Sequence, residues 1–89
     1  MNKTIHKYEV TIVDSCVRQL PEGAVVLSVH VQRGTPFMWA EVDPAAPFVE
    51  RRFELRGTGH PLDGSEGRFV GTFLIRDDSL VFHLYERKA

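Results

Sequence analysis

The segment 57–67 carries the residues of this chain whose types and spacing are best suited to chemistry. It reads GTGHPLDGSEG and contains four of the seven glycines, one of the four histidines and two carboxylates. Glycines let backbone N–H groups approach a ligand closely, and Gly57-Thr58-Gly59 could form an anion-binding nest. Thr58 and His60 would add side-chain donors. The segment therefore predicts a phosphate-binding loop, and an ordered loop without a ligand is the alternative.

The same segment contains the residue types of a hydrolase, namely His60, Asp63 and Ser65. A nucleophilic hydroxyl needs a base beside it, and that base is usually oriented by a third group. Working triads normally draw their members from separate parts of the fold, whereas these three lie within six residues. The spacing favours binding over catalysis, so we expect no enzyme and no catalytic residue. A small hydrolase that uses this loop remains an alternative.

An aromatic residue and two arginines outside the loop complete the predicted ligand site. A nucleotide-like ligand needs an aromatic side chain to stack on its base and cations or amides to hold its phosphate. The predicted ligand-binding residues are Thr58, Gly59, His60, Trp39, Arg56 and Arg33. The aromatic residues could equally anchor a homo-oligomer, because aromatic side chains and arginine are enriched at interfaces.

The composition argues against several functional classes. Eleven basic and twelve acidic residues give a net charge of -1, which offers no electrostatic footprint for nucleic acid. The four histidines are widely spaced, so we expect neither a metal nor a cofactor. No apolar run approaches the roughly 18 residues of a membrane span, and no signal peptide is recognisable. The single cysteine fits a reducing compartment, so we expect a cytoplasmic protein.

The 89 residues allow one domain, residues 1–89, built almost entirely from alternating apolar and polar positions. Breakers recur about every ten residues, and no segment has helical periodicity. We expect an all-β fold, a small antiparallel sandwich or partly open barrel of about six strands. The expected strands cover residues 7–12 (with a distorted continuation to 18), 25–32, 37–42, 49–56, 68–75 and 80–86.

The alternation also predicts which side chains share a face. In the second expected strand, Val25, Leu27, Val29 and Val31 should lie together. The last two strands are apolar on both faces, so each face should be covered by protein or ligand. A partner subunit is a reasonable cover for one of them, and this predicts a homo-oligomer.

The chain contains the motifs IHKYEV (5–10), LPEGA (20–24), LSV (27–29), WA-x-VDP (39–44), GTGHP (57–61), VGTF (70–73) and VFHL (81–84). These motifs resemble those of a family of short phage- and prophage-encoded proteins of unknown function. They span nearly the whole chain in a specific order. The resemblance implies an accessory phage protein acting in the cytoplasm of a bacterial host. It implies no activity and no functional residues.

The sequence features predict a binding protein, and the phage context that the resemblance implies suggests that it counters a host defence function. It would sequester a nucleotide-like signal or dock on a host protein. A virion, assembly or structural oligomer is a further alternative, in which the aromatic faces pack against other copies.

Overall fold

The computed structural model describes residues 2–87, which form seven strands and no helix. The strands are β1 (Thr4–Glu9), β2 (Ser15–Pro21), β3 (Val25–Gln32), β4 (Thr35–Val42), β5 (Phe48–Gly57), β6 (Arg68–Ile75) and β7 (Leu80–Glu86). Since every described element is a strand, no helix of this part of the chain could cross a membrane.

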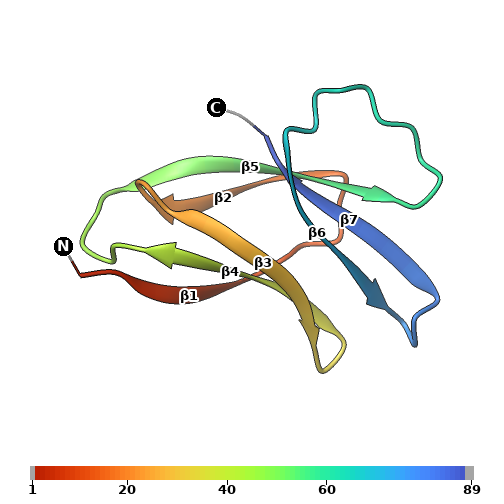
Figure 1. Ribbon diagram of the computed structural model, residues 1–89, viewed down its shortest axis with the longest axis horizontal. Coiled ribbons are helices and arrows are strands. Elements are labelled where there is room, and N and C mark those ends of the chain that lie inside the picture. Colours follow the sequence, from red (N-terminus) through yellow and green to blue (C-terminus); the bar gives the residue numbers. More distant parts are fainter. Residues whose placement is uncertain (1, 88–89) are drawn as a thin grey trace.

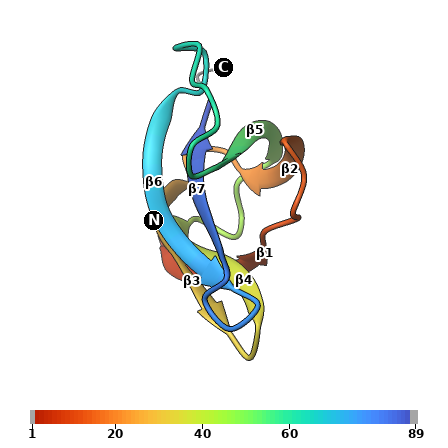
Figure 2. The ribbon, with the colours of Figure 1, turned by 90° about the vertical axis from the view of Figure 1, so that its right-hand side faces the viewer.

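The strands form two antiparallel sheets, β1-β4-β3 and β2-β5-β7-β6 (Figure 1). The sheets pack in a sandwich-like arrangement and do not close into a barrel, which confirms the predicted fold class. Edge strands β3 and β6 lie close together, as Figure 2 also shows. Here the Arg68 Nη2 atom donates a hydrogen bond of 3.1 Å to the Val26 carbonyl.

A single cluster of buried apolar side chains fills the space between the sheets. Both sheets supply it because alternate residues of each strand point inward. Its most completely buried large members are Leu20, Met38, Leu84, Val26 and Val42. Gly71 allows the sheets to meet closely, since a Cβ atom built there would lie 2.8 Å from Val29 Cγ1.

The structure corrects two sequence predictions. The first strand ends at Glu9, and residues 10–14 turn the chain so that Ser15–Pro21 forms a separate strand paired with β5. The second correction concerns β3, where the register shifts between Val26 and Ser28. Because of this bulge, Val29 is buried while Leu27 is 49% exposed, so these two residues do not share a face.

Candidate functional site

The loop 58–67 crosses from one side of β7 to the other. Strands β5 and β6 flank β7 and are both antiparallel to it, so the loop must travel the length of β7. It returns along the outer face, away from the core. Thr58 Oγ1 lies 2.8 Å from Nε2 of His83, and the Arg56 Nε atom lies 3.6 Å from Oε2 of Glu66.

A pocket of about 230 Å³ lies between the loop and this outer face. Its floor includes an imidazole held from both sides. The hydroxyls of Thr58 and Thr72 each lie 2.8 Å from a ring nitrogen of His83. Arg56 pairs with His83 in the sheet register, which places its guanidinium beside the same floor. The lining residues are Arg56, Gly57, Thr58, Gly59, His60, Leu62, His83 and Tyr85.

The amides at the start of the loop are largely engaged within the chain. The Thr58 amide donates to the Val81 carbonyl at 3.2 Å, and the His60 amide donates to the Gly57 carbonyl at 3.1 Å. These bonds continue the β5–β7 pairing and close a tight turn. The nest predicted from Gly57-Thr58-Gly59 therefore lacks the run of free N–H groups that an anion would need.

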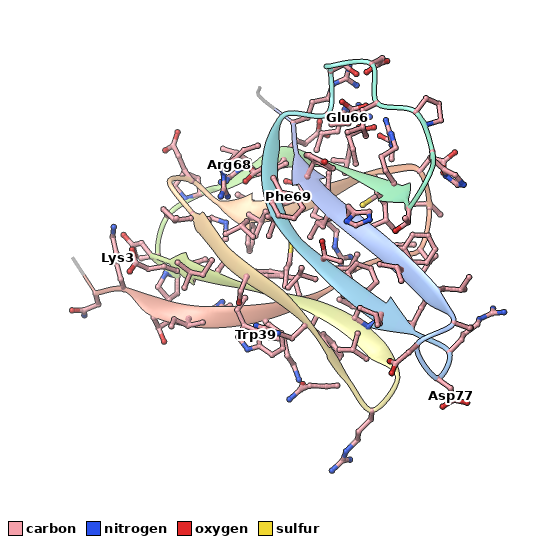
Figure 3. All side chains as sticks on the ribbon, turned by 45° about the vertical axis from the view of Figure 1, so that its right-hand side comes forward. Lys3, Trp39, Glu66, Arg68, Phe69 and Asp77 are labelled. Atoms are coloured by element: carbon pink, nitrogen blue, oxygen red, sulfur yellow. The ribbon has the colours of Figure 1, made fainter. Side chains whose placement is uncertain are left out.

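An anion-binding turn does form later in the loop, and the chain fills it with its own carboxylate. Glu66 accepts hydrogen bonds from the amides of Asp63 (3.1 Å) and Gly64 (3.0 Å). This glutamate is only 4% exposed, and it forms an ion pair of 3.6 Å with Arg56, whose guanidinium also pairs with Glu54 at 3.1 Å. Figure 3 shows Glu66 inside the loop. The glycines therefore shape a loop around an internal anion.

His60, Asp63 and Ser65 do not assemble as a triad. The Ser65 hydroxyl donates to Asp63 Oδ1 at 2.6 Å, and the Ser65 amide donates to the same oxygen at 2.9 Å. These two bonds lower the pKa of Asp63 from 3.8 to about 2. The His60 ring packs over Gly57, with Cε1 3.1 Å from a Cβ atom built there. Within the described residues, no hydrogen bond joins His60 to Asp63 or Ser65.

Trp39 and Arg33, also predicted to contact the ligand, lie elsewhere. Trp39 is on β4 in the three-stranded sheet, well apart from the labelled Glu66 of the loop in Figure 3. Arg33 is in the turn between β3 and β4, where it lines a separate hollow with Lys7 and Phe37. Thr58, Gly59, His60 and Arg56 do share the pocket beneath the loop. The predicted set is thus divided between two parts of the molecule.

The predicted ligand set omits His83 and Tyr85, which line the pocket, and Thr72, whose hydroxyl lies 2.8 Å from a His83 ring nitrogen. The β5–β7 pairing, which brings His83 and Tyr85 beside Arg56 and Glu54, joins strands that are distant in the sequence, whereas Thr72 and His83 are partners in the local β6–β7 hairpin. Alternation along the strand places His83 and Tyr85 on one face, but it does not predict that this face lies beneath the loop. Among the described residues, no group of three or more His, Cys, Asp or Glu side chains could hold a metal ion.

Comparison with known proteins gives a family but no function. No curated protein and no solved structure matches the chain significantly. A family model described as "Domain of unknown function (DUF7352)" matches residues 1–89. The chain therefore belongs to the DUF7352 family.

Proposed function

We propose that this protein is a stoichiometric binding protein that docks on a host protein through the outer face of its three-stranded sheet. The observation that carries the proposal is the amount of apolar surface on that face. Ile5, Val25 and Leu27 are 56%, 47% and 49% exposed. Monomeric proteins rarely leave large contiguous apolar patches in water, and such patches usually mark interaction sites.

Aromatic side chains form the centre of this face. Trp39 pairs with Lys7 and Ser28 in the sheet register, so it points away from the buried Met38 and Ala40. Its ring lies edge-on to Phe37, with centroids 6.2 Å apart. Half-buried aromatic side chains have few rotatable bonds and lose little entropy on binding, which suits them to be interface hot spots.

Charged and polar groups surround the aromatic centre. The Lys7 Nζ atom lies 4.3 Å from the Phe37 ring centroid, and His30 packs edge-on to Trp39 with centroids 5.9 Å apart. An ion pair of 3.6 Å joins Lys3 to Glu41 at the other end of the face. An apolar centre with a polar rim is the usual anatomy of a protein interface.

The same proposal includes a phage or prophage origin, a role against a host defence and action in the host cytoplasm. They depend on the sequence resemblance. A stoichiometric role suits a small domain that acts by occupying a surface and needs no catalytic group.

Two matched substitutions test the docking face. Leu27→Glu adds a charge to the proposed interface, and Leu74→Glu adds the same charge to an exposed position of the other sheet, 42% exposed. In affinity isolation from host cells, we expect the wild type and Leu74→Glu to retain one stoichiometric partner that Leu27→Glu loses. Retention of the same partner by all three proteins would refute the proposal. If light scattering instead shows self-association that only Leu27→Glu abolishes, the face is a homo-oligomer interface.

Hydrolysis is a second candidate, favoured by the hydrogen-bonded chain Thr58–His83–Thr72. A threonine hydroxyl beside an imidazole that a third group orients resembles an activated nucleophile. Thr58→Val would then abolish turnover of phosphate-ester or carboxyl-ester substrates, and Thr72→Val would reduce it. Equal rates in the wild type and Thr58→Val would exclude this candidate.

A further inference from the structure

The four-stranded sheet narrows to two strands at one end and leaves a notch there. Strand β7 stops at Glu86, opposite Phe53, whereas β5 continues to Phe48 in its pairing with β2. A pocket of about 520 Å³ lies at this end of the sheet. This volume is within the usual range for small-molecule sites.

Arginines dominate the lining of the notch. All four strands of the sheet supply residues to the lining, and β5 supplies consecutive residues whose side chains lie on both of its faces. The lining residues are Val17, Glu50, Arg51, Arg52, Arg68, Glu86 and Arg87. Four arginines against two glutamates give the pocket a surplus of two positive charges in a chain of net charge -1. Such a concentrated surplus requires an explanation.

Part of the cluster is structural and keeps the guanidiniums in place. Glu86 is 8% exposed and forms ion pairs with Arg51 and with Arg68, the latter at 3.5 Å. One carboxylate shared by two guanidiniums leaves one positive charge uncompensated. Because Arg51 is itself mostly buried, its guanidinium is held in position before any ligand arrives.

The other two arginines lie at the mouth of the notch. Arg87 reaches Glu54 at 3.8 Å, a long contact that leaves donors available. Arg52 donates only to the Ser15 hydroxyl, at 3.3 Å, and no carboxylate of the described residues lies within ion-pair distance of it. The Arg87 amide donates to the Arg52 carbonyl at 2.9 Å, so these two residues are held side by side.

We propose that this notch, lined by Arg51, Arg52, Arg68 and Arg87, binds a small phosphate-bearing molecule. Guanidiniums present planar, paired donors that match phosphate oxygens, and they keep their charge at every physiological pH. Arg51 and Arg68 would hold the inner phosphate, while Arg52 and Arg87 would close over the outer one. The site is separate from the docking face, so it does not depend on the proposed function.

The site can be tested by titrating the protein with inorganic pyrophosphate and measuring binding by isothermal calorimetry at low ionic strength. Arg52→Gln/Arg87→Gln removes the two mouth arginines and leaves the Glu86 ion pairs intact. Arg33→Gln/Arg76→Gln is the matched control, because it removes the same charge from two exposed turns. We expect the mouth variant to bind pyrophosphate at least about tenfold more weakly, and the control to change by less than about twofold. Thermal melting of each variant shows whether it remains folded.

A further variant addresses the interior of the site. Arg51→Lys keeps the charge beside Glu86 but loses the paired donors, so we expect a smaller loss of affinity in a folded protein. Citrate as a competing probe separates phosphate recognition from general anion attraction, and pyrophosphate should bind more tightly. No binding by the wild type at about 5 mM pyrophosphate would overturn the proposal. So would equal loss in the control variant, or tighter binding of citrate.

Discussion

The junction between the crossover loop and β6 depends on Gly67, and replacing it with alanine should destabilise the protein strongly. Gly67 has φ of +96°, and a Cβ atom built there would lie 2.2 Å from the Glu86 carbonyl oxygen and 2.7 Å from Arg87 Cα. Both neighbours are backbone atoms at the end of β7. The loop and the strand end therefore cannot relax by rotating a side chain.

The magnitude can be assembled from two contributions. A left-handed backbone conformation costs alanine about 1–2 kcal/mol, partly offset by the restricted unfolded chain. The steric overlap adds about 1–3 kcal/mol, since the strand end or the loop must move. We expect Gly67→Ala to lower the free energy of unfolding by about 2–4 kcal/mol, or Tm by roughly 8–32 °C in a domain of this size.

Gly64→Ala is the control that separates these contributions. Gly64 lies in the same loop with φ of +90°, but nothing lies within 4 Å of a Cβ atom built there. Gly64→Ala should therefore lose only the cost of placing alanine in a left-handed backbone conformation, about 1 kcal/mol. Urea unfolding at one temperature measures both variants. If the two variants lose equal stability within about 0.5 kcal/mol, Gly67 does not approach the backbone of β7 closely enough to exclude a Cβ atom.

Three further changes test other contacts. Gly71→Ala should lower the free energy of unfolding by about 1–3 kcal/mol because its Cβ would meet Val29 Cγ1. Adding Val29→Ala should recover part of that loss, and additive costs of the two substitutions in urea unfolding would argue against this contact between the sheets. Glu66→Gln keeps one accepting oxygen and puts an NH2 donor in place of the other, so hydrogen-exchange protection of the Asp63 amide or the Gly64 amide should fall; unchanged protection of both amides would contradict the internal anion. Because the pKa of Asp63 is lowered in the folded state, ionised Asp63 stabilises the fold at pH values above 3.8. This contribution is lost as the pH falls towards about 2. Carboxyl NMR titration should therefore show the Asp63 pKa moving up towards 3.8 in Ser65→Ala, and an unmoved value would refute the assigned cause.

The sequence was sufficient for the elements whose alternation is regular. Residues 68–75 and 80–86 were predicted with the bounds that β6 and β7 have, because a tight turn and period-two patterning define both strands. Strand β2 was missed as a separate element. The chain bends at residues 10–14, a segment that contains neither proline nor glycine and so has no local signal for the end of a strand.

Contacts between distant strands could not be predicted in the same way. The bulge after Val26 reverses the face of the following residues, and no local signal marks it. Glu66 was not recognised as the anion of the loop because its role depends on a turn that folds back on it. Likewise, the arginine notch gathers residues from four strands whose order is set by tertiary packing.

Docking of a host protein on the outer face of the β1-β4-β3 sheet can be tested in host cells. A photo-crosslinking amino acid at position 27 of the intact protein would capture a protein that contacts this face. Position 74 on the other sheet is the matched control, since both leucines are exposed. We predict one discrete crosslinked partner from position 27 and none from position 74. No crosslinked species, or the same species from both positions, would contradict the account.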